Sequence, residues 1–528
     1  MSAKATWKVS AAVMASRVLG LVRDQIFAAM FGYGVLTDCF NIAFRIPNLL
    51  RDLFAEGALS QAFVTTFSKR IKESGPESAW PLAARMITIV AITMAAISII
   101  GIVFSPQLVH LLTAFSKGKT FSPEDIALTV KMTRIMWPFM LLVSLAALVM
   151  GILNARGVFG IPALSSCFFN LGSIIAGTGI GLWLDPNRGP MTMVGMAIGV
   201  LVGGLGQLLC QVPSLRRLGF RWRPDWKWND SDVRKIFSLM GPAVISASVV
   251  QINVVINSQF ATSIGPSAVS ALNGAFRLMQ LPIGVFGVAV ATVTLPALSI
   301  AATGKLGDDF RGLLAKGIRL VTFLVLPSAL GLCFLAEPII SALFEHGRFS
   351  PENRLVTAAA LRGYGIGLLA YSWLKVLQPA FYAADRRWVP MLVSFFAIGM
   401  SVTSNWYFVV VRGMGVEALA LTTSIVATSN FVILYVVMSR MTSGLETRSL
   451  LVLITKLVIA GAAMAGVCVA ANHFVFRDLS TMSALTRIAG LSVVIPIAGT
   501  IYFALSKLMK VEEAGEFLAL VRKRIRKS

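Results

Sequence analysis

Two segments decide the fold: MASRVLGLVRDQIFAAMFG at residues 14–32 and TDCFNIAFRIPNLLRDLFAEGALSQAFV at residues 37–64. Apart from their charged residues both resemble membrane helices, yet the first carries Arg17 and Arg23 and the second carries Arg45 and Arg51. A cation at bilayer depth costs at least about 2.5–3.5 kcal/mol, so such residues normally face a protein interior or a watery cavity. This cluster therefore predicts a chamber inside the membrane for an anionic substrate.

The composition predicts an all-α polytopic membrane protein. The 528 residues are 56% hydrophobic and only 13% charged, whereas soluble proteins have about 25% charged residues. A span needs about 20 mostly apolar residues, and the first, second, seventh and eighth spans are too polar to be found by hydropathy alone. We expect fourteen transmembrane helices, at 7–30, 36–67, 86–105, 128–154, 161–183, 191–212, 236–262, 268–301, 318–336, 355–382, 389–411, 416–439, 450–474 and 488–509.

The distribution of Lys and Arg predicts the orientation. With the N-terminus in the cytoplasm, 30 of the 47 Lys and Arg residues fall in cytoplasmic segments, 8 in external segments and 9 within spans. This positive-inside bias predicts that both termini are cytoplasmic. It also accounts for most of the net charge of +23 without a nucleic-acid partner. The basic tail at 510–528 is expected on anionic inner-leaflet lipid, with a solvated tail as the alternative.

The two halves of the chain contain matching motifs. AFR at 43–45 recurs at 275–277, and FSPE at 121–124 recurs at 349–352, each FSPE resembling a helix start with Ser as N-cap and Pro at the first helical position. Chance matches among short motifs are the alternative. The repeat predicts two pseudo-symmetric six-helix lobes related by an axis along the membrane normal, with the substrate site between them. The predicted parts are 1–215, 232–440, two additional C-terminal helices within 450–509, and the tail 510–528.

Charged residues of the first two spans alternate in sign on shared helical faces. Arg17 and Asp24 are seven residues apart and share a face, with Arg23 beside them. Acids would hold the arginine side chains in place, while arginine is well suited to forking onto phosphate oxygens. Internal ion pairs that lock helices together are the alternative reading. The second span places four charged residues within about 40° of one face: Asp38, Arg45, Asp52 and Glu56.

The remaining polar residues do not predict an enzyme. No GxxxxGK[ST] motif occurs, no catalytic constellation stands out, and the five Cys and three His have no metal-ligand spacing. We therefore expect no cofactor and no metal site, and a transporter driven by an ion gradient or the membrane potential. Asn253 and Asn257 share a helical face and could hydrogen-bond between helices or coordinate a cation. Gly203 and Gly204 predict close helix packing.

The quoted segments together resemble the MurJ/MviN family, the lipid II flippases of bacterial cell-wall synthesis. That family belongs to the multidrug/oligosaccharidyl-lipid/polysaccharide exporter superfamily. The resemblance is carried by SRxLGxxRD and TDxFxxAFxxPNLLRxLFAEGAxSxAF within residues 16–67, by AFRLMQLPIGVFGVAVATVTLPALS at 275–299, and more loosely by LFEHGRFS and LQPAFYAADRRWVP. The family's layout of fourteen spans covers essentially the whole chain.

The resemblance implies a central cavity whose basic residues bind the diphosphate of the substrate. It also implies a lipid groove lined partly by the two helices within 450–509. Three positions depart from the family pattern: Asp52 and Gln280 replace a basic and an acidic residue, and Arg386 stands where an acid often contributes to a sodium site. Whether Asp385 binds an ion therefore stays open. The implied cavity residues are Arg17, Arg23, Asp24, Asp38, Arg51, Glu56, Arg277 and, more weakly, Asn170; Arg45 joins them from its position on the charged face.

The sequence therefore predicts a monomeric, multi-pass flippase of the bacterial cytoplasmic membrane. Its substrate would be a polyprenyl-diphosphate-linked muropeptide, lipid II, carried by alternating access with a coupling cation or the membrane potential. Two transporter alternatives remain: a flippase for another polyprenyl-diphosphate-linked oligosaccharide, and a cation-coupled multidrug exporter. The arginine-rich chamber disfavours the exporter, because cationic drugs call for acids and aromatic residues. A non-transporting membrane scaffold is the third alternative.

Overall fold

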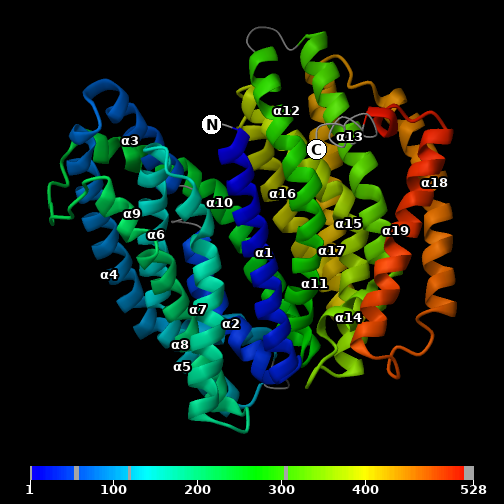
Figure 1. Cartoon of the computed structure of the whole chain (residues 1–528), viewed down its shortest axis with the longest axis horizontal. Coiled ribbons are helices and arrows are strands. Elements are labelled where there is room, and N and C mark those ends of the chain that lie inside the picture. The colour runs from blue at the N-terminus through cyan, green and yellow to red at the C-terminus, as the bar shows by residue number, and fades with distance from the viewer. Residues whose placement is uncertain (1–2, 53–58, 117–120, 303–306, 517–528) are drawn as a thin grey trace. The chain divides into compact units, whose positions relative to one another are not determined.

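The fold is entirely helical in the part of the chain that the structure describes. The structure is a computed structural model and describes residues 3–52, 59–116, 121–302 and 307–516 (Figure 1). No strand occurs within those ranges. The chain divides into two compact units, Met1–Ser270 and Ala271–Ser528. The prediction of an all-α protein is therefore confirmed.

The first unit contains ten α-helices and two short 3-10 turns in its described residues. Its elements are α1 (Ala3–Phe31), α2 (Val35–Arg51), α3 (Ser60–Ser74), η2 (Glu77–Ala79), α4 (Trp80–Thr113), η3 (Ala114–Ser116), α5 (Pro123–Met136), α6 (Pro138–Ala155), α7 (Gly160–Leu184), α8 (Pro190–Leu209), α9 (Val212–Arg217) and α10 (Ser231–Ile264). Within this unit α10 packs against α3, α4 and η3.

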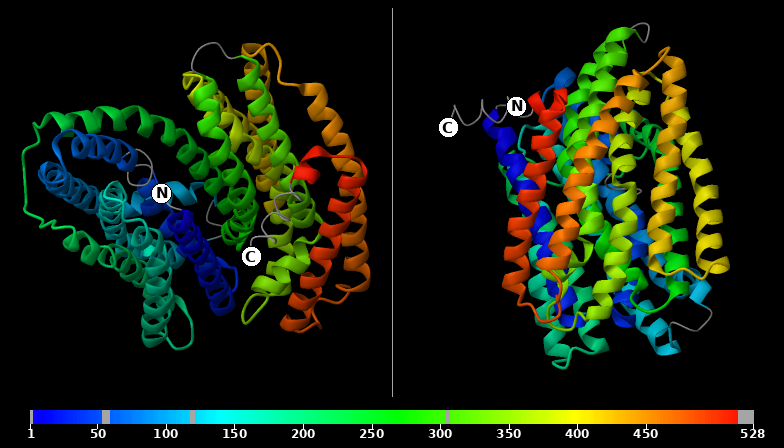
Figure 2. Two further views of the ribbon diagram at one scale, coloured as in Figure 1. Left: turned by 45° about the horizontal axis from the view of Figure 1, so that its top comes forward. Right: turned by 90° about the vertical axis from the view of Figure 1, so that its right-hand side faces the viewer.

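The second unit begins within the first turn of α11 and is also helical throughout its described residues. Its elements are α11 (Ala268–Pro282), η4 (Ile283–Gly287), α12 (Val288–Ala301), α13 (Asp308–Phe334), α14 (Ala336–Phe344), α15 (Pro351–Ala383), α16 (Trp388–Asn405), η5 (Trp406–Val411), α17 (Val416–Met441), α18 (Thr447–Phe474) and α19 (Ala484–Leu508). Both η4 and η5 are π-helical turns. Helices α18 and α19 run side by side, and both contact α13 (Figure 2).

Ten segments within the described residues are long and apolar enough to cross a membrane. The eighth predicted span is among them, with a mean hydropathy of 2.1 over its best window, so the prediction that it is too polar is wrong. Its long apolar run after Arg277 outweighs that charge. By contrast α15 falls outside the ten, because Arg354, Arg362 and Lys375 interrupt it. The ten are Glu77–Ser116, Pro123–Ala155, Gly160–Leu184, Pro190–Arg217, Ala268–Ala301, Asp308–Phe334, Trp388–Val411, Val416–Met441, Thr447–Phe474 and Ala484–Leu508.

Both FSPE motifs begin a helix, as the sequence predicts. The Ser122 Oγ accepts a hydrogen bond from the backbone N–H of Asp125, 3.1 Å away, and α5 starts at Pro123. The Ser350 Oγ accepts one from the N–H of Asn353 at 3.2 Å, and α15 starts next to it. A side-chain acceptor satisfies one of the N–H groups that a helix start leaves without an intrahelical partner.

Glycine allows α7 and α8 to approach each other to backbone contact. A Cβ added to Gly195 would lie 2.3 Å from the Cα of Gly181, and one added to Gly199 would lie 2.4 Å from the Cα of Gly177. A Cβ on Gly203 would meet the Phe169 carbonyl at 2.5 Å. These distances confirm the predicted role of Gly203 in close packing. Small residues allow such approach in membranes, where van der Waals contact drives helix association.

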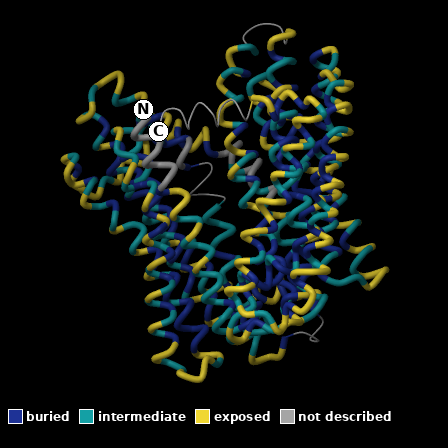
Figure 3. Tube along the Cα trace, turned by 45° about the vertical axis from the view of Figure 1, so that its right-hand side comes forward, coloured by how far each residue is buried: buried dark blue, intermediate teal, exposed yellow. Residues whose placement is uncertain are grey.

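A buried ion-pair cluster connects three helices of the second unit. Glu345, just after α14, accepts hydrogen bonds from Arg354 of α15 at 2.8 and 2.9 Å. Arg487 of α19 lies 3.5 Å from the same carboxylate and also donates to the Leu479 carbonyl at 2.7 Å. All three charged side chains are buried, each at most 10% exposed. Buried and exposed residues alternate along the long helices, as expected when one face of each helix packs and the other does not (Figure 3).

Arg85 fixes the segment between α9 and α10 to the start of α4. Its Nε donates to the Asp225 carboxylate at 2.7 Å, and its Nη1 pairs with Asp230. Burial by itself raises the pKa of Asp225, but hydrogen bonds from the Lys227 N–H and from Arg85, together with their charges, outweigh it and lower that pKa. The contacts of Arg85 and Lys227 with Asp225 therefore favour the ionised form of the Asp225 carboxylate.

Substituting Gly195 with alanine should destabilise the protein by about 1–3 kcal/mol, the typical cost of overpacking. The added methyl group would collide with the backbone of Gly181 and of Ile180, which cannot move aside as a flexible side chain would. The melting temperature in detergent, followed by size-exclusion chromatography after heating, measures the loss. Gly179→Ala is the matched control in α7, because a Cβ there has nothing within 4 Å. Equal melting temperatures for the two variants would contradict the proposed contact.

Asp225→Asn should lower the melting temperature at pH 7, and the difference from the wild type should shrink on acidification. Because the folded-state pKa is lowered, the stabilising contribution is fully present above the ordinary Asp pKa of about 3.9 and is lost as pH falls through the folded value. Melting curves between pH 7 and pH 3 test this. Asp478→Asn, at an exposed position, serves as the control. A difference in melting temperature between Asp225→Asn and the wild type that persists unchanged at low pH would rule out a stabilising role for the ionised Asp225.

Candidate functional site

Helices α1 and α2 carry most of the predicted site residues and are held by their apolar faces. Helix α1 packs against α7, and α2 packs against α4, α5, α6 and α8. The buried residues of α2 recur at helical spacing and include Cys39, Ile42, Ala43 and Ile46. At its start, the Gly34 N–H donates to the Thr37 Oγ1 at 2.8 Å. The apolar face sets the rotation of α2, which leaves Arg45 and Arg51 half-buried, whereas Asp38 is buried with the apolar residues.

Arg23 is oriented by its neighbour in sequence and by an aromatic ring. Its Nε and Nη2 donate to Asp24 Oδ1 at 3.3 and 3.2 Å. The guanidinium carbon lies 5.6 Å from the ring centre of Phe169 on α7, within the range of a cation–π interaction. Both charged side chains are largely buried, at 18% and 19% exposed. The adjacent pair and Phe169 together fix where this cation lies.

Phenylalanine contacts connect the helices around Arg23 into a closed circuit. The contacts pass from α1 to α2, α6 and α7, and Arg23 on α1 closes the circuit over Phe169. Such aromatic pairs stabilise by about 0.5–1.5 kcal/mol beyond their burial. The separations between ring centres are 4.9 Å for Phe27–Phe40, 6.5 Å for Phe40–Phe44, 5.5 Å for Phe44–Phe139 and 5.4 Å for Phe139–Phe169. Sequence spacing did not reveal this circuit, because its members come from four separate helices.

Arg17 and Asn170 have different surroundings, although both lie near the α1–α7 contact. Asn170 is only 6% exposed, and its Nδ2 donates to the Ser16 carbonyl at 3.1 Å. Gly20, one turn along α1, leaves room for this amide, 3.7 Å from where a Cβ would be. Arg17 is half-buried and makes no hydrogen bond or ion pair with any residue that the structure describes. Among the arginines of α1, Arg17 therefore differs from Arg23, which pairs with Asp24.

Asp38 is fully buried and binds the last residue of the first unit. Its Oδ1 accepts the Ser270 N–H at 2.8 Å and the Ser270 Oγ–H at 2.5 Å. Asn41, one turn along α2, donates to the same Ser270 hydroxyl at 3.0 Å. Ser270 was not among the predicted residues, since a serine 232 positions away in sequence gives no signal of contact.

The second pair of arginines lies along α2. Arg51, its last residue, donates to Asp52 Oδ1 through Nη2 at 2.7 Å and through Nε at 3.1 Å. Arg45 is half-buried on the same helix. Glu56 lies outside the described residues, so the structure gives no account of it. Each described Arg–Asp contact in this helix and in α1 joins neighbours in sequence rather than residues one turn apart.

The remaining candidates lie on other helices. Arg277 is exposed on α11 in the second unit. On α10, the Asn257 Nδ2 donates to Asn253 Oδ1 at 3.0 Å, which confirms that the two amides share a face. Asp385 is exposed with φ of 53°, and its carboxylate is 3.9 Å from Arg387. No group of three or more His, Cys, Asp or Glu side chains that could hold a metal ion occurs among the described residues.

Comparison with known proteins identifies the family. The family model described as "Lipid II flippase MurJ" matches residues 27–490. A "Probable lipid II flippase MurJ" of Vibrio cholerae is 35% identical over 469 residues, covering 87% of each chain. The "Lipid II flippase MurJ" of Burkholderia cenocepacia is 35% identical over 414 residues, covering 78% of this chain and 79% of that one.

Solved structures agree with this assignment. A structure titled "Lipid II flippase MurJ, inward closed conformation" has a TM-score of 0.74 at 25% identity and covers 94% of this chain and 98% of its own. A multidrug resistance MATE family transporter of the MOP superfamily has a TM-score of 0.60 at 15% identity, covering 83% and 94%, and shares the fold alone. With a matching family model, curated relatives above 30% identity and a helical membrane fold, this chain belongs to the MurJ family of lipid II flippases.

Proposed function

We propose that this protein moves lipid II from the inner to the outer leaflet of the bacterial cytoplasmic membrane by alternating access. The proposed activity transports a lipid and makes or breaks no covalent bond. Membership of the family supports the substrate. The observation that carries the site is the arginine chemistry of α1 and α2, in which Arg17 is uncommitted among the described residues while Arg23 and Arg51 are each held by an aspartate.

In this proposal the arginines bind the diphosphate of the lipid II head group. Arg is suited to this role because its planar donors match phosphate oxygens. Arg23 and Arg51 are kept in position by Asp24 and Asp52, while Arg17 supplies charge that no described protein group neutralises. Arg45 and Asp38 would belong to the same lining, as would Glu56, and Arg277 would contribute from the second lobe. Asn170 would act through α1, because it holds the Ser16 carbonyl.

The proposed architecture has fourteen spans in two six-helix lobes, with two further helices. In addition to the ten apolar segments, α1, α10, α15 and the pair α2–α3 supply the remaining four. The sequence repeat assigns α10 to the second lobe, at 232–440, whereas internal contacts group it with residues 1–270. Helices α18 and α19, within 450–509, would line a groove for the polyprenyl tail, and the tail at 510–528 would lie on the inner leaflet.

Movement of the anionic head group outward would be favoured by an inside-negative membrane potential, at about 2.3 kcal/mol per charge per 100 mV. A coupling cation remains an alternative energy source. We propose a monomer with both termini in the cytoplasm. The lobes would rock relative to each other, exposing the chamber to one side of the membrane at a time.

Depleting the protein in its source organism should raise the amount of lipid II and cause lysis. Mass spectrometry of extracted polyprenyl-diphosphate-linked glycans measures this directly. A rise confined to another lipid-linked oligosaccharide would move the assignment to that substrate. No rise in any lipid-linked glycan would contradict the flippase proposal and favour the multidrug exporter or the scaffold.

Arg17→Ala should abolish complementation of the depleted strain while leaving expression and melting temperature unchanged. The physical reason is the loss of a cation that binds the ligand rather than the protein. The measurement is cell growth together with cleavage of outer-leaflet lipid II by an externally added hydrolase. Arg17→Lys should retain part of the activity, because lysine keeps the positive charge but lacks the paired, planar N–H donors of arginine.

Lys69→Gln is the matched control for Arg17→Ala. Lys69 is an exposed cation whose described partner is Glu73, 3.4 Å away on the same helix, and surface pairs of this kind contribute little. Its loss should leave transport unchanged. Normal growth on Arg17→Ala alone would exclude Arg17 from the diphosphate site without affecting the family assignment.

A further inference from the structure

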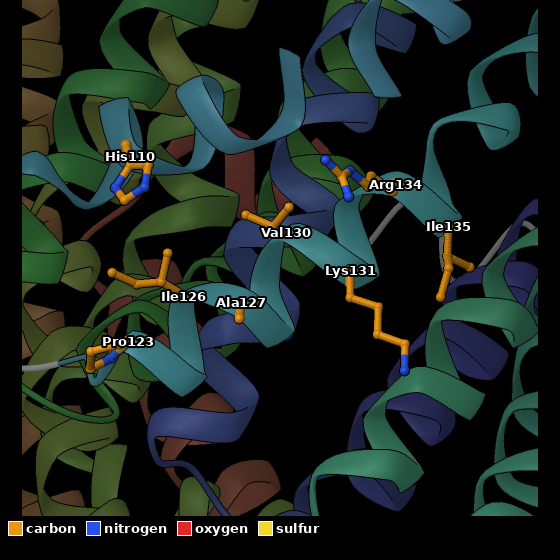
Figure 4. A pocket seen from close by; sticks show the side chains of 8 residues that line it. All are labelled: His110, Pro123, Ile126, Ala127, Val130, Lys131, Arg134 and Ile135. Carbon is orange, nitrogen blue, oxygen red and sulfur yellow. The ribbon is translucent and has the colours of Figure 1, made fainter. Parts of the chain in front are cut away.

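The first unit contains a cationic pocket that takes none of its lining residues from α1 or α2. It has a volume of about 740 Å³ and is formed by the end of α4 and the outer face of α5 (Figure 4). Its wall combines apolar side chains with three basic ones. The lining residues are His110, Pro123, Ile126, Ala127, Val130, Lys131, Arg134 and Ile135. None of these residues belongs to the arginine site of α1 and α2.

The pocket lies on the face of α5 that points away from the protein interior. Thr129, Met132, Thr133 and Met136 are buried, whereas Lys131 and Arg134 are exposed. At 100° per residue the two cations project from the side opposite the buried four. Helix α5 packs on α2 within the unit, so the pocket face is turned outward.

The neighbouring surface of α4 shows what this face contacts. Several large apolar side chains of α4 are more than half exposed, as expected for a surface in lipid rather than in water. A soluble protein would not leave such a stripe uncovered beside two cations. The exposed residues are Ile99 at 63%, Ile100 at 57%, Val103 at 61%, Phe104 at 52% and Leu111 at 55%.

Neither cation of the pocket has a carboxylate partner among the described residues. The Lys131 Nζ lies 3.9 Å from the sulfur of Met191, a weak acceptor. The Arg134 Nε donates to the Ile102 carbonyl at 3.3 Å. Cations within a span are costly unless they find an opposite charge or reach the interface. Two uncompensated positive charges beside an apolar wall therefore call for an anionic amphiphile.

The depth of Lys131 and Arg134 in the membrane matches the depth of a lipid phosphate group. With a rise of 1.5 Å per residue, Lys131 lies about 12 Å and Arg134 about 16 Å from the start of α5. Pro123–Ala155 comprises 33 residues, so it is about 50 Å long and extends about 10 Å beyond a 30 Å hydrocarbon core at each end. Both cations then lie within about 6 Å of the core boundary, within reach of phosphate by snorkelling.

We propose that this pocket binds one anionic phospholipid. Its phosphate would lie between Lys131 and Arg134, and the first segments of its acyl chains would lie against Ile126, Val130 and Ile135. In the orientation proposed above, the lipid belongs to the outer leaflet. The pocket thus gives the protein a fixed site for an ordinary membrane lipid, separate from the chamber for its transported substrate.

Native mass spectrometry of the purified full-length protein tests the proposal. The protein in neutral detergent is titrated with phosphatidylglycerol, and with phosphatidylcholine of the same acyl chains. We expect one phosphatidylglycerol to be retained with an affinity that falls about tenfold or more in Lys131→Met/Arg134→Met, because each cation near a phosphate contributes to the attraction. Phosphatidylcholine should be retained equally by the wild type and the variant.

Two further variants keep the result interpretable. Lys131→Arg/Arg134→Lys preserves both charges and should retain the lipid, and Arg412→Met removes an exposed cation outside the pocket and should bind as the wild type does. Melting temperatures establish that each variant folds. Should the double Met variant fail to fold, the same titration on Lys131→Gln and Arg134→Gln singly decides, with a smaller loss expected in each.

Three outcomes would overturn the proposal. The first is equal retention of phosphatidylglycerol by the wild type and the variant that lacks both charges. The second is equal retention of phosphatidylcholine and phosphatidylglycerol by the wild type, which would show that the negative charge of the lipid head group is not recognised. The third is complete competition by inorganic phosphate at the same concentration as the lipid, which would show that the apolar wall contributes nothing and that the ligand is a free anion.

Discussion

The low solvating power of the bilayer for charge is the constraint on which the rest of this structure depends. Every cation placed in a span must find a carboxylate, an aromatic face or an anionic ligand, or reach the membrane interface. Arg23 uses Asp24 and the ring of Phe169, while Arg354 uses the carboxylate of Glu345. The cations that lack such compensation among the described residues are the ones that can bind something else.

Close helix packing makes this selective compensation possible. The glycines of α7 and α8 bring the two backbones into contact. Helix α1 packs against α7, which this contact holds in place. The phenylalanine circuit then sets the rotation of α1 relative to α2, α6 and α7. A cation whose helix could roll freely would pair with whichever acid came near. Rigid packing instead holds Arg23 at one place and leaves Arg17 without an ion-pair partner in the described part of the chain.

The two cationic sites of the first unit differ in the same physical terms. Around α1 and α2, positive charge is interleaved with aspartate, which suits a hydrated chamber for a multiply charged head group. On α5, Lys131 and Arg134 stand beside an apolar wall with no described acid, which suits a lipid with a charged end and hydrocarbon chains. Snorkelling of the α5 cations toward the interface is the geometry that brings them to a phosphate.

The sequence by itself determined the helical membrane class, both FSPE helix starts, the family and the unusual polarity of the first two spans. The class, the helix starts and the polarity follow from composition, period and capping chemistry, all of which are local, whereas the family follows from the resemblance of the motifs within 16–67 and at 275–299. Only the tertiary structure decided that Arg23 pairs with the adjacent Asp24, that Asp38 binds Ser270, and that Asn170 holds the backbone of α1. Helical spacing reports which residues share a face, but a long side chain reaches its nearest acid, and contacts between distant segments are set by packing.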